Sequence, residues 1–130
     1  MRSAIIVCAS LLVIGMSPPL QAQSRPQIIG IFSNMGIGAE SGDVGGVELD
    51  VTYGKGSFYV LFQMAEGTPD VPILMTLDAK DSTVSFSFPE ESKYFAGLRT
   101  FNGTVTRTGI RGSFANGYSI NLRRLECRAR

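Results

Sequence analysis

The sequence predicts an all-β protein, a small antiparallel meander that forms a closed or nearly closed barrel of seven or eight strands. Short segments alternate apolar and polar residues with a period of two, and turn signals separate these segments. In the last third of the chain, glycines lie between apolar core positions, where they let a sheet coil sharply. Because closure removes exposed strand edges, a barrel is preferred over the alternative, a two-sheet β-sandwich.

Residues 1–22 have the order of regions that is typical of a secretory signal peptide. Met1-Arg2-Ser3 supplies a positive start, residues 4–16 are uncharged and mostly apolar, and Ser17-Pro18-Pro19 precedes the small residue Ala22. The apolar run is shorter than the roughly 20 residues that a membrane span requires. We therefore expect cleavage near Gln23, an exported (periplasmic or secreted) protein, and no stable membrane span after cleavage. An uncleaved N-terminal anchor is the alternative.

The remaining residues are expected to make one domain. Residues 23–46 contain an apolar piece, expected to be a first strand, and then a long, flexible, glycine-rich loop. Residues 47–124 make the β-barrel domain, and residues 125–130 make a basic tail that is interpreted as a solvated terminus. Elsewhere basic and acidic residues are interspersed, so no basic stripe predicts a nucleic-acid partner.

Four strands are expected in the middle of the chain, at residues 47–53, 57–65, 71–77 and 84–88. Gly54-Lys55-Gly56 predicts a tight turn between the first two of them. Pro72 has no backbone donor, so the strand at 71–77 is expected to begin at an edge or a bulge. A further strand piece is expected at residues 94–98.

The last third of the chain predicts three strands with close packing between them. Phe-x-Gly-x-Val at 101–105 and Ile-x-Gly-x-Phe at 110–114 each place a glycine, Gly103 or Gly112, between two core residues. On adjacent strands these glycines allow the coiling that a small barrel needs. Asn116-Gly117 predicts a β-hairpin with a type I′ turn, because both residues tolerate a positive φ.

Residues 45–124 resemble a loosely defined group of small exported bacterial β proteins of uncharacterised function. The resemblance rests on the motifs Glu66-Gly67-x-Pro69, Val84-x-Phe86-x-Phe88-Pro89, Phe101-x-Gly103-x-Val105, Ile110-x-Gly112-x-Phe114 and Leu122-x-Arg124. The pattern is also similar to lipocalin-like barrels, although the chain has no tryptophan and so lacks the Gly-x-Trp that lipocalins carry near the first strand. The resemblance implies a barrel and supplies no catalytic residues.

The composition argues against an enzyme. The chain has no histidine, which removes Ser-His-Asp and Cys-His catalysis and the usual zinc sites. We expect no cofactor and no metal. Cys8 lies in the predicted signal peptide, so Cys127 has no internal disulfide partner. It is expected to be an incidental thiol or to link two chains as a disulfide-bonded dimer.

The acidic pairs and the glycine-rich loop do not predict a catalytic or nucleotide site. Glu48 and Asp50 share a strand face, and Glu90-Glu91 lies in a loop, so both pairs are interpreted as solvated charge. The loop has the pattern Gly36-x-Gly38-x-x-x-Gly42, which does not have the spacing of a dinucleotide-binding loop.

The four tyrosines are the candidates for a partner-binding surface, because tyrosine combines an apolar body with a polar tip. They are Tyr53, Tyr59, Tyr94 and Tyr118. We expect a non-catalytic exported protein that binds a partner protein or an apolar small molecule in the cell envelope. The alternative is an inhibitor of a secreted or periplasmic hydrolase that acts through its loops. A ligand carrier should have a hollow apolar interior, whereas an inhibitor should have a filled core and a protruding loop.

Overall fold

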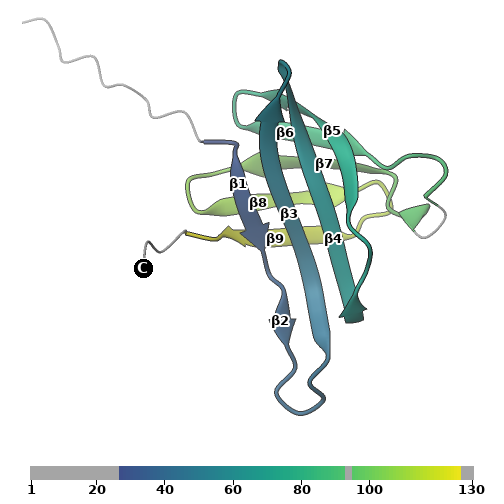
Figure 1. The fold of residues 1–130 in the computed structure, drawn as a ribbon. Helices are drawn as coiled ribbons and strands as arrows, with labels where there is room; N and C mark the ends of the chain where they lie inside the picture. The colour runs from purple at the N-terminus through teal and green to yellow at the C-terminus, as the bar shows by residue number, and fades with distance from the viewer. Residues whose placement is uncertain (1–26, 93–94, 127–130) are drawn as a thin grey trace, which may run out of the picture.

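The computed structural model describes residues 27–92 and 95–126, so the predicted signal peptide, Tyr94 and Cys127 lie outside the described residues. The described strands form one antiparallel sheet in which β1 (Gly30–Ser33) pairs with both β3 (Val44–Gly54) and β9 (Ser119–Arg124). This double pairing closes eight strands into a barrel, and β2 (Gly36–Ile37) is added outside the ring on β3 (Figure 1). The predicted all-β barrel is thereby confirmed.

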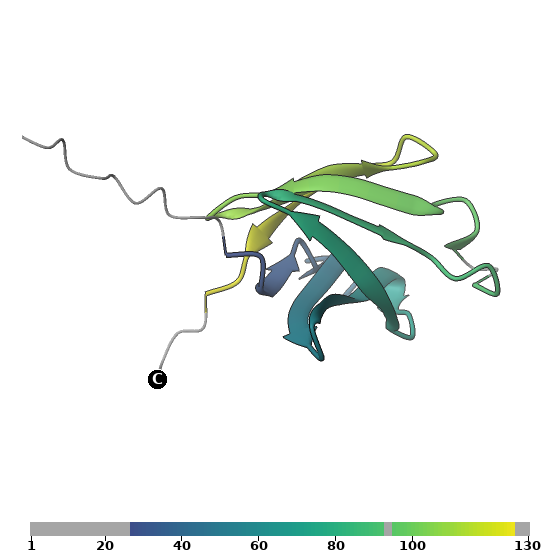
Figure 2. The same cartoon turned by 90° about the horizontal axis from the view of Figure 1, so that it is seen from above.

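From β3 to β9 the barrel is a meander, because each strand pairs with the next one along the chain. The remaining strands are β4 (Ser57–Pro69), β5 (Ile73–Lys80), β6 (Thr83–Ser87), β7 (Thr100–Val105) and β8 (Gly109–Phe114). β5 begins directly after Pro72, as expected for a residue that cannot donate to a ladder. Figure 2 shows β7–β9 on one side of the barrel and β3 and β4 on the other.

Two expected boundaries are wrong. The barrel begins at Gly30 rather than at residue 47, because β1 is needed to close the ring. The piece expected as a strand at 94–98 is not one over Phe95–Leu98: Leu98 N donates to Phe95 O at 2.9 Å, which makes a turn. The apolar side chains of Phe95 and Leu98 are buried in the core, so this piece covers the barrel instead of adding to the sheet.

The hairpin at Asn116-Gly117 is present, but the expected type I′ turn is wrong. Of these two residues only Gly117 has a positive φ, of 88°. Gly117 N donates to Phe114 O at 2.9 Å and Phe114 N donates to Tyr118 O at 2.8 Å, which makes a three-residue loop that ends in a bulge. The Asn116 side chain accepts from Tyr118 N and fixes this form. The type I′ turn occurs instead at Lys55-Gly56, where both φ angles are positive.

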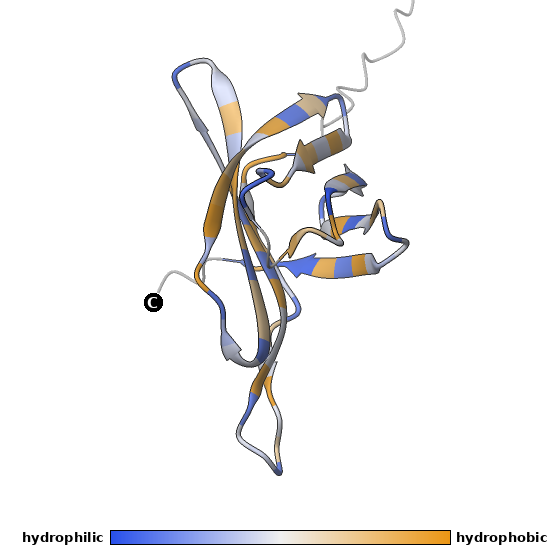
Figure 3. Ribbon diagram, turned by 90° about the vertical axis from the view of Figure 1, so that its right-hand side faces the viewer, coloured by the Kyte–Doolittle hydropathy of each residue, from blue (hydrophilic) through white to orange (hydrophobic). Residues whose placement is uncertain are grey.

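The interior of the barrel is filled by aromatic rings. Phenylalanines from β4 and β6 to β8, with two from the β6–β7 connection, form a network with ring centroids 4.9–6.4 Å apart. The six rings belong to Phe62, Phe86, Phe88, Phe95, Phe101 and Phe114. On several strands, hydrophobic and hydrophilic bands alternate (Figure 3), because one face meets this core and the other meets solvent.

Gly103 and Gly112 lie directly opposite each other on β7 and β8. A Cβ atom at Gly103 would lie 2.6 Å from the ring of Phe101 and 2.8 Å from the Arg111 carbonyl oxygen. A Cβ atom at Gly112 would collide with the Asn102 carbonyl oxygen and lie 2.5 Å from Phe101 Cζ. The ring of Phe101 therefore rests in space that the two glycines leave free.

Candidate functional site

The β2–β3 hairpin projects away from the barrel (Figure 1). Its tip, residues 38–43, is held by its own hydrogen bonds: Gly38 N donates to Asp43 O at 2.8 Å, and Gly42 N donates to Gly38 O at 2.9 Å. The expected flexible loop is thus a short hairpin with a defined tip. Ile37 is 74% exposed on it, beside the exposed acidic residues Glu40 and Asp43.

The base of the hairpin is fixed to the barrel through Asn34. Its backbone N donates to Val47 O at 3.1 Å, and its side-chain Oδ1 accepts from Val47 N at 2.7 Å. Val47 is itself fully buried in the core. The hairpin therefore keeps one direction relative to the barrel, and the exposed side chain of Ile37 is held away from any internal packing role.

The described tyrosines do not form one surface. Tyr53 lies at the end of β3, more than half exposed, with its ring edge-on to Phe58 at 4.9 Å between centroids. Tyr59 lies near the start of β4, opposite Thr52 on β3. Tyr118 lies in the β8–β9 turn and stacks on Phe114. Tyr53 and Tyr59 therefore lie near the same end of the β3–β4 pair, Tyr118 lies between two other strands, and Tyr94 lies outside the described residues.

Arg124 closes one end of the barrel. It follows the inward-facing Ile120 and Leu122 on β9 with a spacing of two, and its guanidinium lies 4.5 Å from the centroid of the Phe32 ring. Arg124 donates through Nη1 to Ile29 O at 2.8 Å and through Nε to Arg107 O at 3.1 Å, and it also donates to the carbonyl oxygens of residues 27 and 106. Burial lowers the pKa of Arg124.

The Arg124 contact was missed by sequence reasoning, although a signal for it exists. Arginine at a position whose period places it inside a strand needs internal acceptors, and here backbone carbonyls supply them. The partner on β1 is Gly30-Ile31-Phe32, in which Phe32 lies under the guanidinium and a Cβ atom at Gly30 would collide with it. These residues join the first strand to the last one.

Charge is segregated along the chain, which corrects the expectation that acidic and basic residues are interspersed. Residues 28–98 contain ten acidic residues and three lysines, whereas residues 99–130 contain seven arginines and one acidic residue, Glu126. In the barrel, the segment from β7 to β9 carries Arg107, Arg111, Arg123 and Arg124 and no carboxylate. One side of the molecule is therefore rich in arginine.

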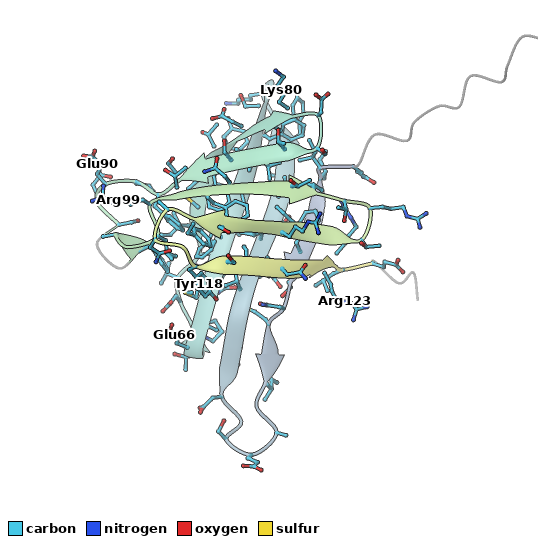
Figure 4. The ribbon with its side chains drawn as sticks, turned by 180° about the vertical axis from the view of Figure 1, so that it is seen from behind. Glu66, Lys80, Glu90, Arg99, Tyr118 and Arg123 are labelled. Atoms are coloured by element: carbon cyan, nitrogen blue, oxygen red, sulfur yellow. The ribbon has the colours of Figure 1, made fainter. Side chains whose placement is uncertain are left out.

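Three open depressions lie on this side. A depression of about 550 Å³ covers β7–β9, and a second one of about 380 Å³ adjoins it, since both are lined by Asn102 and Gly103. The largest, of about 1040 Å³, lies at the end of β9. The lining of the largest includes Ser33, Asn34, Arg107, Arg123, Arg124 and Glu126. Figure 4 views this side and shows Arg123 and Tyr118 at opposite ends of β9.

The acidic pairs are not assembled into a site with other chemical groups. Glu48 and Asp50 lie in register with Gln63 and Leu61 on β4. Over residues 27–92 and 95–126, no group of three or more cysteine, aspartate or glutamate side chains is placed to hold a metal ion. No helix in the same residues is long and apolar enough to cross a membrane.

Comparisons of the chain with protein-family models, with curated proteins and with solved structures give no match. The class of this protein is therefore defined by its architecture: a closed eight-stranded antiparallel barrel with a filled interior and one projecting hairpin.

Proposed function

We propose that this chain is an exported, non-catalytic binding protein of the cell envelope that engages a partner protein with its β2–β3 hairpin. The observation that carries the proposal is the ordered hairpin, in which Ile37 is largely exposed and the tip that follows it carries the exposed Glu40 and Asp43. The side chain of Ile37, on β2 directly before this tip, does not pack in the barrel core and is available for contact with another molecule.

The filled core favours a protein partner over an enclosed apolar ligand. The ring of Phe62 lies within 4.9–6.4 Å of four other phenylalanine rings, which occupy the space where a carrier would hold its ligand. Phe95 and Leu98 cover one side of this core, and Arg124 closes an end of the barrel. Binding is therefore assigned to the outside of the barrel.

Inhibition of a secreted or periplasmic hydrolase is the second candidate, and the hairpin tip favours it. A tip fixed by its own hydrogen bonds and tied to the core through Asn34 loses little conformational entropy when it enters a cleft. The carboxylates of Glu40 and Asp43 suit a cleft with a basic rim.

We also propose that the chain is related to lipocalin-like barrels. The aromatic residue of Gly30-Ile31-Phe32 has the spacing of the Gly-x-Trp motif, with phenylalanine in place of tryptophan. Phe32 packs in the barrel beneath Arg124 of the last strand. This kinship supports a role in binding and does not name a ligand.

Site-specific photo-crosslinking in the producing cell tests the hairpin. A benzophenone amino acid at position 37 should give a discrete crosslinked adduct with a partner protein. The matched control is the same amino acid at position 53, an exposed site about 30 Å away at the other end of β3. Equal adducts at both positions, or none at position 37, would contradict the proposal.

Ile37→Asp tests function directly. This exposed change should leave the thermal midpoint unchanged and abolish the adduct formed from a crosslinker at position 40. If the partner is a hydrolase, the parent protein should inhibit it and Ile37→Asp should not. A partner that is captured but fully active would exclude the inhibitor and leave the binding proposal standing.

A further inference from the structure

The outer face of β6–β9 has an unusual composition. Every outward position on these four strands is serine, threonine, asparagine, glycine or arginine. The rows run across the strands in register: Ser85, Asn102, Ser113 and Ser119 in one, and Thr83, Thr104, Arg111 and Asn121 in the next. Ser113 and Ser119 hydrogen-bond to each other at 2.8 Å, so part of this hydroxyl layer is already ordered.

Three arginines at this face have side chains without a partner among the described residues. The guanidinium groups of Arg107, Arg111 and Arg123 make no hydrogen bond or ion pair with another described residue, in contrast to Arg124. Arg111 pairs with Asn121, and Arg123 pairs with Gly109, so the two arginines are diagonal neighbours on adjacent strands. Their positive charges remain available to a ligand. We call these three residues and the two rows the arginine face.

The arginine face has a shallow, open depression. Gly103, Arg111 and Gly112 on β7 and β8 line it. The adjoining depression continues to β5, where both Asp78 and Lys80 line it. Strands lie about 4.8 Å apart, so the two rows from β6 to β9 are about 14 Å long. A shallow surface of this length suits an extended chain better than a single small ion.

The chemistry of the arginine face selects the class of ligand. Hydroxyl and amide groups both donate and accept hydrogen bonds, as sugar hydroxyls do. Free guanidinium groups pair with carboxylate or sulfate groups through two parallel bonds. Single-stranded nucleic acid needs aromatic platforms for its bases, and neither row contains an aromatic residue. The two rows themselves contain no carboxylate, and the exposed Asp78 on β5 borders them beside Ser85.

We propose that the arginine face binds an anionic polysaccharide, with the arginines on its acidic groups and the rows of hydroxyl and amide side chains on its sugar hydroxyls. This site is separate from the β2–β3 hairpin and does not depend on the function proposed for it. The probes for the test are heparin as a sulfated chain, polygalacturonate as a carboxylated chain, and dextran as a neutral chain.

Calorimetric titration of the purified protein should show binding to heparin or polygalacturonate and none to dextran. Arg111→Gln with Arg123→Gln should weaken this binding about tenfold or more, since two charge-assisted contacts are lost. The matched control, Lys55→Gln with Arg99→Gln, removes the same charge from two exposed residues elsewhere and should change the affinity less than about twofold. Equal losses in the two double variants would overturn the site.

A second pair of changes separates a glycan from any other polyanion. Asn102→Leu with Ser113→Val keeps the charge and removes hydrogen-bonding groups from one row. It should weaken polysaccharide binding strongly but leave any weak binding to duplex DNA or phosphatidylglycerol vesicles unchanged. The variants' thermal midpoints establish that they fold, because both positions are exposed. No binding to either anionic chain, tighter binding to DNA or vesicles, or an undiminished polysaccharide affinity in this variant would overturn the proposal.

Discussion

The packing around Gly103 and Gly112 in the β7–β8 ladder leaves no space for a side chain. Gly103→Val and Gly112→Val should each reduce the free energy of unfolding by about 2 kcal/mol or more, although valine favours strands. The reason is the collision of the new Cβ with Phe101 and with neighbouring carbonyl oxygens. Urea unfolding measures the loss.

Gly45→Val is the control for these changes. Gly45 also lies in a strand, and a Cβ atom there would meet only the Ala65 carbonyl oxygen, at 4.0 Å. We expect this variant to be about as stable as the parent. If the variants at Gly103 and Gly112 were equally stable, the ring of Phe101 would not be packed as described.

The adjacent residues Arg123 and Arg124 have different roles, and substitution of each by lysine distinguishes them. Arg124→Lys should cost about 2 kcal/mol, because an ammonium group cannot reach the carbonyls of Ile29 and Arg107 together and loses the planar contact with Phe32. Arg123→Lys should leave stability unchanged, since the Arg123 side chain has no partner among the described residues. Denaturation curves compare the two, and equal midpoints would contradict the closure assigned to Arg124.

At the scale of elements, periodicity predicted the strands that are half buried and regular. β6 lies within one residue of its expected position, because Val84 and Phe86 alternate with polar residues. β2 has two residues, too few for any period, and its pairing depends on Asn34 and Val47, which are distant in sequence. The strand predicted to contain Phe95 and Leu98 is wrong, because apolar residues that are buried in a turn cannot be told by hydrophobicity from those of a buried strand.

The candidate sites were predictable only in part. The glycine-rich segment marked the place of the hairpin, but the hydrogen bonds that order its tip depend on backbone geometry. Similarly, the arginine face depends on the register that sets Arg111 beside Arg123, and the sequence separates these two residues by a full hairpin. The segregation of charge, by contrast, is visible in the sequence itself, so the expectation of interspersed charges was wrong without any need of the register.

The direction of the hairpin depends on Asn34, and its removal is expected to loosen the element. Asn34→Ala should cost about 1 kcal/mol, because Val47 N loses its side-chain acceptor. Amide hydrogen exchange at residues 36–45 should become faster than in Asn34→Asp, which keeps an acceptor oxygen. Unchanged exchange in Asn34→Ala would show that the hairpin is held by other contacts.

The whole barrel depends on one long-range pairing. Phe32 pairs with Arg124, and the remainder of the ring is made of neighbours in sequence. A chain that ends at residue 118 lacks β9 and should expose the edges of β1 and β8. We expect this truncated chain to lose its cooperative thermal transition and to bind a hydrophobic dye. A sharp transition in the truncated chain would show that an open sheet is stable.

The pairing of β1 with β9 also sets the order in which the protein can be completed. The first strand of the ring leaves the ribosome long before its partner exists, so no intermediate length of nascent chain contains a closed barrel. A protein that crosses a membrane in extended form benefits from such a delay. For the exported protein proposed above, the barrel could not close before β9 had been made. The chain would therefore stay competent for translocation until its last strand was complete.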